Sequence, residues 1–144
     1  MLYALTLAAR PTLIVEFGTS LGYSTIHLAS ALRDLDAGTI LTTELLPEKA
    51  NRAALNLDAG PRDLVEIRGG NALESLTYID ADVDLLFLDG SNDLYLPVLE
   101  LLEPRLTQCA LIIADMSHDE PHHALYRDHV NGPDYLTGSV RPSV

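Results

Sequence analysis

The chain has 144 residues, 47% of them hydrophobic, which is enough apolar material for one packed core and too little length for two ordinary domains. We therefore expect residues 1–144 to form a single domain. The formal net charge of −12 argues against nucleic acid and anionic membrane surfaces as partners, because both are bound through clustered positive charge.

No apolar stretch approaches the roughly 20 residues that a membrane-spanning helix needs. Residues 1–10 lack the basic start that is typical of a signal peptide. A cytoplasmic location is the expectation.

Five short runs of leucine and β-branched residues alternate with amphipathic stretches. We interpret the runs as strands at residues 12–17, 39–44, 64–68, 83–89 and 110–115. The spacing predicts helices at 23–33, 47–57 and 93–106. This alternation is typical of a parallel sheet with helices on its faces, so we expect an α/β fold that is Rossmann-like, doubly wound and mostly parallel.

The pattern weakens beyond Asp115. Residues 117–131 are polar and rich in histidine, which favours a loop and a short helix, and residues 135–140 are a candidate last strand. Cys109 is the single cysteine and lies in an apolar run, where we expect a buried structural thiol.

Acidic residues stand at or near the ends of four predicted strands, at Glu16, Glu44, Asp89 and Asp115. Any one of them could simply cap a helix. In an open parallel sheet, however, the ligand lies across the carboxyl ends of the strands. We therefore expect the four carboxylates to converge on one rim.

The loop after the first strand contains Gly18 and Gly22 and leads into a predicted helix. Glycine lets backbone approach a ligand, and the free N–H groups of a helix start favour a carboxylate or phosphate. A dinucleotide fingerprint needs Gly-x-Gly-x-x-Gly, and Ser20 stands where its middle glycine would be. The sequence thus predicts a ligand loop that accommodates a pyrophosphate poorly.

Five segments resemble, in order and spacing, the motifs of class I S-adenosylmethionine-dependent methyltransferases. They are residues 16–24, 43–44, 68–74, 87–91 and 112–115. The pattern is most similar to the small-molecule O-methyltransferases related to catechol O-methyltransferase. This resemblance implies S-adenosylmethionine as the cofactor and an oxygen of a small molecule as the methyl acceptor.

The resemblance also implies roles for individual residues. Gly18 and Ser20 would offer backbone groups to the methionine part, and Ser24 would lie near its carboxylate. Glu44 would accept the ribose hydroxyls, as a carboxylate can do with its paired oxygens. Asn71 and Ala72 would border the adenine. The full set assigned to the cofactor is Glu16, Gly18, Ser20, Ser24, Glu44, Asn71, Ala72 and Asp89.

In the metal-dependent branch of that family, aspartates matching Asp89 and Asp115 and an asparagine after the second one hold magnesium. Here that third position is Met116, whose thioether is a poor ligand for a hard cation. The lysine expected after the first aspartate is also replaced, at about Asn92. We therefore expect no tight magnesium site, and at most a weak one that depends on the acceptor.

Asp115 and His118 are the candidates for catalytic work on the acceptor. His118, His122 and His123 could supply a general base or a metal site beside Asp115, because histidine titrates near neutrality. A solvated polar loop is the favoured interpretation of this stretch. His27 and His129 are expected to be structural or exposed.

Two alternatives stay open from the sequence. One is an S-adenosylmethionine-binding or interaction domain without transferase activity, which the residues at Met116 and Asn92 suggest. The other is a nicotinamide-dependent enzyme, which would share the sheet and the acidic end of the second strand but needs the missing glycine. Association into a homo-oligomer is compatible with either.

Overall fold

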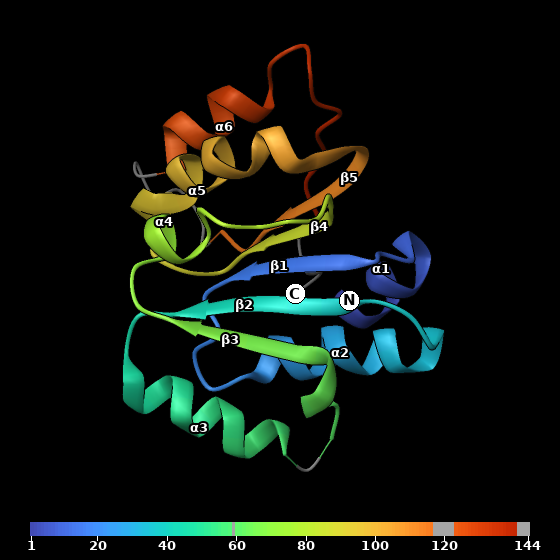
Figure 1. The fold of residues 1–144 in the computed structure, drawn as a ribbon. Helices are drawn as coiled ribbons and strands as arrows, with labels where there is room; N and C mark the ends of the chain where they lie inside the picture. The colour runs from blue at the N-terminus through green and yellow to red at the C-terminus, as the bar shows by residue number, and fades with distance from the viewer. Residues whose placement is uncertain (59, 117–122, 141–144) are drawn as a thin grey trace.

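A five-stranded parallel sheet forms the centre of the computed structural model, which describes residues 1–58, 60–116 and 123–140. The strand order is β3-β2-β1-β4-β5 (Figure 1). The strands are β1 (Leu13–Phe17), β2 (Thr39–Glu44), β3 (Val65–Gly69), β4 (Val83–Leu88) and β5 (Leu106–Ala114). All of the predicted strands up to residue 115 are confirmed, with β5 beginning earlier than expected.

Helices cover both faces of the sheet (Figure 1). One face carries α1 (Leu2–Ala9), α2 (Tyr23–Leu35) and α3 (Pro47–Leu57), and the other carries α4 (Ala72–Ser75), α5 (Tyr95–Leu102) and α6 (Ala124–Val130). The predicted Rossmann-like, doubly wound α/β fold is therefore confirmed.

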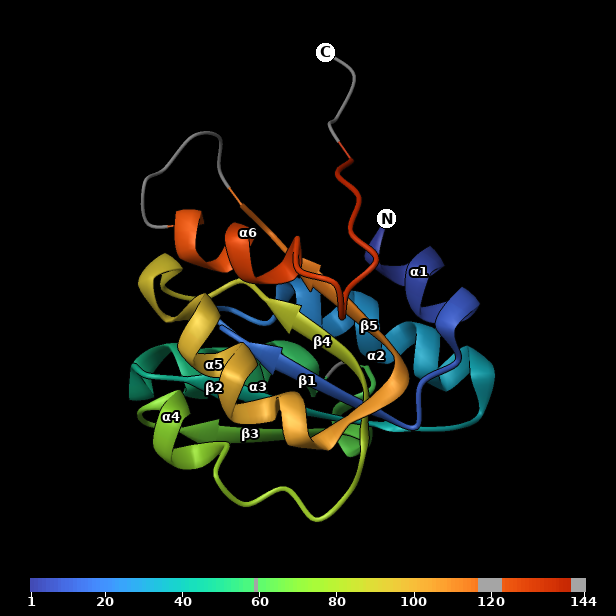
Figure 2. The same ribbon diagram turned by 90° about the horizontal axis from the view of Figure 1, so that it is seen from above.

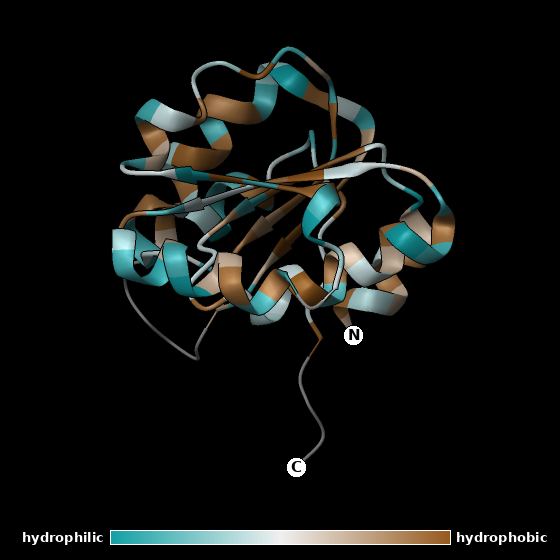
Figure 3. Ribbon diagram, turned by 60° about the horizontal axis from the view of Figure 1, so that its bottom comes forward, coloured by the Kyte–Doolittle hydropathy of each residue, from teal (hydrophilic) through white to brown (hydrophobic). Residues whose placement is uncertain are grey.

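The central strand β1 explains why the fold has two apolar layers. Successive side chains of a strand point to opposite faces, so Val15 packs in the cluster beneath α4, α5 and α6, and Ile14 packs in the cluster beneath α2 and α3. Both side chains are fully buried. Figure 3 shows largely apolar strands between helices that carry polar and apolar bands.

Some elements differ from the sequence-based expectation. The predicted helix at 93–106 is α5 flanked by two 3₁₀ turns, Asn92–Leu94 and Glu103–Arg105, and Pro104 lies in the second turn, where a helix with an unbroken hydrogen-bond ladder would not tolerate it. The helices α1 and α4 were not predicted.

The edge of the sheet at β5 corrects two further expectations. Residues 135–140 do not form a strand, so β5 is an edge strand (Figure 2). Cys109 is exposed rather than buried, because nothing among the described residues pairs with the outer edge of β5 and the strand's register is irregular near Cys109.

Among the described residues, no helix is long and apolar enough to cross a membrane.

Candidate functional site

The parallel register brings the ends of the strands into one row. Phe17 pairs with Thr43 and with Leu88, and Leu88 pairs with Ala114. The residues that directly follow these four in the chain are Gly18, Glu44, Asp89 and Asp115. The N–H groups of Asp89 and Asp115 continue the ladder, donating to the carbonyls of Phe17 and Leu88 at 2.9 Å each. Glu44, Asp89 and Asp115 thus lie along one rim of the sheet.

The loop between β1 and α2 is held in an unusual backbone conformation. Gly18, Ser20 and Gly22 all have positive φ, at 104°, 47° and 84°. A Cβ on Gly18 would lie 2.5 Å from the carbonyl oxygen of Asp89, so only glycine allows β1 and β4 to continue side by side into the rim. Ser20 adopts the left-handed region despite having a side chain, which is uncommon and requires the surroundings to hold it there.

Glu44 is the group that holds Ser20. Its Oε2 accepts the N–H of Ser20 at 2.8 Å, and its Oε1 accepts the N–H of Leu46 at 2.9 Å. The side chain is buried, with 8% of its surface exposed. A carboxylate can accept about four hydrogen bonds, so each oxygen keeps one further acceptor direction.

Glu16 lies below the rim, two residues before Gly18, and is fully buried. Its oxygens accept hydrogen bonds of 2.6 Å from three hydroxyl groups, those of Ser24, Thr25 and Thr42. Glu16 therefore does not converge with the other three carboxylates, which corrects that expectation. Because side chains alternate along β1, the side chain of Glu16 points to the face that α2 covers.

The hydrogen bonds around Glu16 connect it to the ligand loop. The hydroxyl of Thr42 lies 2.6 Å from that of Thr19. Because Thr42 has one hydroxyl proton and donates it to Glu16, Thr19 must donate to Thr42. Burial raises the pKa of the Glu16 carboxyl above its ordinary value, and the three hydroxyl bonds oppose this shift. Glu16 and Glu44 hold the loop from two sides.

Asp89 and Asp115 form an acidic pair at the ends of β4 and β5. Partial burial raises the pKa of Asp89 to about 6, and the negative charge of Asp115 adds to the shift. Tyr95 of α5 lies beneath the pair and donates its hydroxyl to the carbonyl of Asp115 at 2.6 Å. Burial and the two carboxylates raise the pKa of Tyr95 as well.

Sequence reasoning missed the aromatic cluster around Tyr95. Its ring makes edge contacts with Phe17 and Tyr126, at centroid distances of 6.3 and 5.9 Å, and a tilted contact with His123 at 5.4 Å. His123 is fully buried, and neither ring nitrogen has a hydrogen-bond partner among the described residues. This corrects the expectation of a solvated position for His123. His118 and His122 lie outside the described residues.

The other two histidines have identified contacts. His27 is exposed and packs edge-on against Tyr23 at 4.9 Å. His129 bonds to Glu103 at 2.5 Å.

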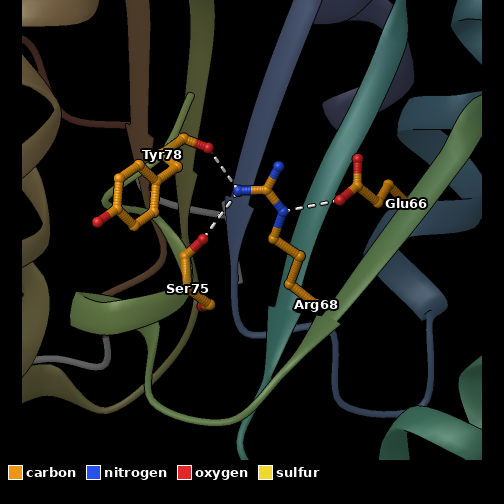
Figure 4. Close-up of polar contacts among 4 residues, drawn as sticks. All are labelled: Glu66, Arg68, Ser75 and Tyr78. Atoms are coloured by element: carbon orange, nitrogen blue, oxygen red, sulfur yellow. Dashed lines mark hydrogen bonds and ion pairs between the residues drawn. The ribbon is translucent and has the colours of Figure 1, made fainter. Parts of the chain in front are cut away.

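The segment after β3 begins at Gly70, whose N–H donates to the carbonyl of Glu44 at 2.9 Å. Asn71 caps α4, and its side-chain oxygen accepts the N–H of Leu73 at 3.0 Å. Ala72 is buried. Arg68 of β3 contacts the far end of the segment (Figure 4). The segment therefore lies beside Glu44, at the β3 end of the rim.

A separate, open hollow of about 1360 Å³ runs along the outer side of β5. Residues of β5, α6 and 131–139 line it, and it reaches the rim at Ala114 and Met116. None of the rim carboxylates Glu44, Asp89 and Asp115 lines this hollow.

The chain order changes direction at β1 and β4, and the loop with three positive φ values lies at that point. This defines an open α/β domain whose ligand loop sits at the topological switch point, where ligands of such sheets bind. Residues 15–124 match a family described as a methyltransferase domain. The chain belongs to this methyltransferase domain family.

Curated relatives are similar over most of this chain. Catechol O-methyltransferase of Sus scrofa is 35% identical over 109 residues, which cover 72% of this chain and 55% of that protein. Catechol O-methyltransferase of Niastella koreensis is 34% identical over 107 residues, which cover 71% of this chain and 48% of that protein. The chain thus spans about half the length of these relatives.

Solved structures show the same fold. The O-methyltransferase TomG of Streptomyces achromogenes, in complex with SAM, has a TM-score of 0.81 and 26% identity over 90% of this chain and 66% of its own. An O-methyltransferase from Bacillus cereus, in complex with SAH, has a TM-score of 0.79 and 27% identity over 92% of this chain and 68% of its own.

Proposed function

We propose that this chain binds S-adenosylmethionine and transfers its methyl group to an oxygen of a small-molecule acceptor. Glu44 supports the proposal most directly. Its carboxylate is fixed at the rim by two backbone N–H groups and keeps an acceptor direction on each oxygen, which suits the two neighbouring hydroxyls of a ribose. Two relatives of the same fold were solved with SAM or SAH.

The ligand loop would receive the methionine part of the cofactor. Gly18 and Ser20 present backbone there, and the first turn of α2 has N–H groups without partners inside the helix. The hydroxyl of Ser24 is bonded to Glu16, so we assign its backbone N–H, rather than its hydroxyl, to the methionine carboxylate. Glu16 would act by ordering Ser24 and Thr25 rather than by touching the cofactor.

The bound cofactor supplies an activated methyl group for in-line displacement. The residues of this chain would orient the acceptor and take up its proton, which lowers the barrier mainly through proximity and general base action. Asp115 is the proposed acceptor-side residue. Asp89, with a pKa of about 6, lies beside it and is available as a base near neutral pH. His118 stays a prediction.

Magnesium does not fit this rim well. Met116 packs against the core cluster beneath α5 and offers sulfur rather than oxygen, and a hard cation prefers oxygen ligands. The described residues contain no group of three or more His, Cys, Asp or Glu side chains placed to hold a metal ion. The acceptor-side steps are therefore assigned to the rim carboxylates. Three other expectations from the sequence stay predictions: self-association, the single-domain organisation and a cytoplasmic location.

Calorimetric titration with S-adenosylhomocysteine and with NAD tests the cofactor assignment, and we expect the first alone to bind. Glu44→Gln is expected to weaken binding by about 2 kcal/mol, because a charged acceptor is lost. Glu48→Gln, at an exposed carboxylate in the first turn of α3, is the matched control and should bind normally. Equal affinities of the two variants would contradict the role of Glu44.

Activity is tested separately with a panel of catechols and phenols. Methyl transfer to any of them supports the proposed reaction. Cofactor binding without transfer to any acceptor would favour the alternative of an inactive binding domain.

A further inference from the structure

Two adjacent glycines join β3 to the segment that follows it, because Gly69 ends the strand and Gly70 begins the segment. A Cβ built on Gly69 or Gly70 would meet no atom within 4 Å, and Gly70 has a positive φ of 101°. Glycine has wide conformational freedom, and open space around it removes the steric limits that packing would impose. The start of the segment is therefore tied by the bond from Gly70 N–H to the Glu44 carbonyl and by the buried side chain of Ala72, with no packing around the two glycines themselves.

The far end of the segment is held by Arg68 (Figure 4). Its Nη1 donates to the carbonyl oxygens of Ser75 and Tyr78, at 2.8 Å each. That nitrogen carries two hydrogens, so the two bonds do not compete. The helix α4 has four residues and cannot satisfy its own last carbonyls. Arg68 supplies the missing donor and joins the end of α4 to β3.

The third bond of Arg68 matters less. Its Nε donates to Glu66 at 2.7 Å, but 61% of the Glu66 side chain is exposed, and exposed ion pairs contribute little. The hydrophobic anchors of the segment, Leu76 and Ile79, are buried at 2% and 5% exposure. They keep the segment packed without Arg68, so the arginine sets where the segment lies rather than whether the chain folds.

We propose that Arg68 is a positioning residue for the adenine end of the cofactor site. It holds residues 70–79 in the arrangement in which Asn71 and Ala72 would border the adenine. The proposal rests on the proposed function. Without Arg68, the glycine pair lets the segment adopt other arrangements, and the apparent affinity falls by the fraction of time spent in the competent one.

The test compares Arg68→Met with Arg62→Met. Arg62 precedes the same strand and also donates through Nη1 to a backbone carbonyl, that of Val65, but it lies at the opposite end of β3 from the rim. Binding of S-adenosylhomocysteine and of S-inosylhomocysteine, which has an oxo group in place of the adenine amino group, is measured by calorimetry. Thermal unfolding checks that each variant is folded.

We expect the unsubstituted chain to prefer the adenine ligand. In Arg68→Met, the affinity for S-adenosylhomocysteine should fall about tenfold if the competent arrangement drops to about a tenth of the population. The ratio of the affinities for S-adenosylhomocysteine and S-inosylhomocysteine should become smaller. Arg62→Met should change neither quantity. Arg68→Lys should recover part of the preference, because an ammonium has three donors and can reach a carbonyl.

Two outcomes would overturn the proposal. One is unchanged affinity and preference in folded Arg68→Met, or in folded Arg68→Gln, whose shorter side chain cannot bridge the two carbonyls, should the methionine variant not fold. The other is an equal loss for both ligands, which would show a general loss of stability instead of a change at the adenine end. Failure of the proposed function is distinguishable, because the unsubstituted chain would then bind neither ligand.

Discussion

Replacing Thr42 with valine is expected to destabilise the fold by about 3 kcal/mol. The Thr42 hydroxyl lies in the interior, where it donates to Glu16 and accepts from Thr19, both at 2.6 Å. A hydrogen bond contributes about 0.5–1.5 kcal/mol, and more where the acceptor is ionised, and a buried hydroxyl left without a partner costs about 1–3 kcal/mol. Valine keeps the shape of threonine, so packing changes little.

The neighbouring Thr43 is the matched control. It is also buried, at 2% exposure, but its hydroxyl has no partner among the described residues. Thr43→Val removes an unpaired polar group and should be neutral or stabilising by up to about 1 kcal/mol. Thr42→Ser keeps the hydroxyl and should lose about 1 kcal/mol for its methyl group.

Urea unfolding at pH 7, followed by circular dichroism, measures these differences, and unchanged m-values would show that the comparison concerns stability alone. Thr42→Val and Thr43→Val should differ by at least about 2 kcal/mol. Equal losses in the two variants would refute the reasoning that the bonds around Glu16, rather than threonine burial, hold this part of the structure.

Three further predictions concern the rim. Gly18→Ala should lose at least about 2 kcal/mol of stability from its clash with the Asp89 carbonyl, whereas Gly70→Ala should lose about 1 kcal/mol from backbone strain; similar thermal unfolding of both would contradict the packing argument. Carbon NMR should place the pKa of Asp89 near 6, above its ordinary 3.8, and Asp115→Asn should lower it. Because the folded pKa is raised, the stabilising contribution of protonated Asp89 is lost as pH rises from about 4 through 6. Methyl transfer by the unsubstituted chain should persist after exhaustive chelation, whereas Met116→Asn should become more active when magnesium is added. If the activity of the unsubstituted chain collapses on chelation and returns with magnesium, Asp89 and Asp115 suffice to bind the ion.

The rim could be anticipated from the sequence because buried parallel strands are continuous apolar runs. Glu44, Asp89 and Asp115 each stand at the end of such a run, so the end of the run marks the rim. Glu16 could not be placed as safely, because it precedes the last strand residue, Phe17. The alternation of side chains along a strand was the available signal. A residue inside the strand points to one face of the sheet, where a helix covers it, so Glu16 is buried beneath α2 and does not reach the rim.

The features that sequence reasoning missed depend either on backbone groups or on which other segments of the chain cover a strand. Arg68 bonds to carbonyl groups, which every residue possesses, so no pattern of side chains marks its partners. The four residues of α4 are too few to show a helical period. The exposure of Cys109 depends on what lies outside β5, and an apolar run alone cannot distinguish an edge strand from a central one.

The central position of β1 has a consequence for folding kinetics. Ile14 pairs with Ile40 on one side but with Leu85 on the other, so the second pairing closes a far longer loop and is slow to form. The rim between Gly18 and Asp89 is therefore assembled only when this long-range pairing is complete. A ligand that binds only the assembled rim stabilises the folded state and not the unfolded chain, so the bound domain should unfold at a higher temperature as the ligand concentration rises.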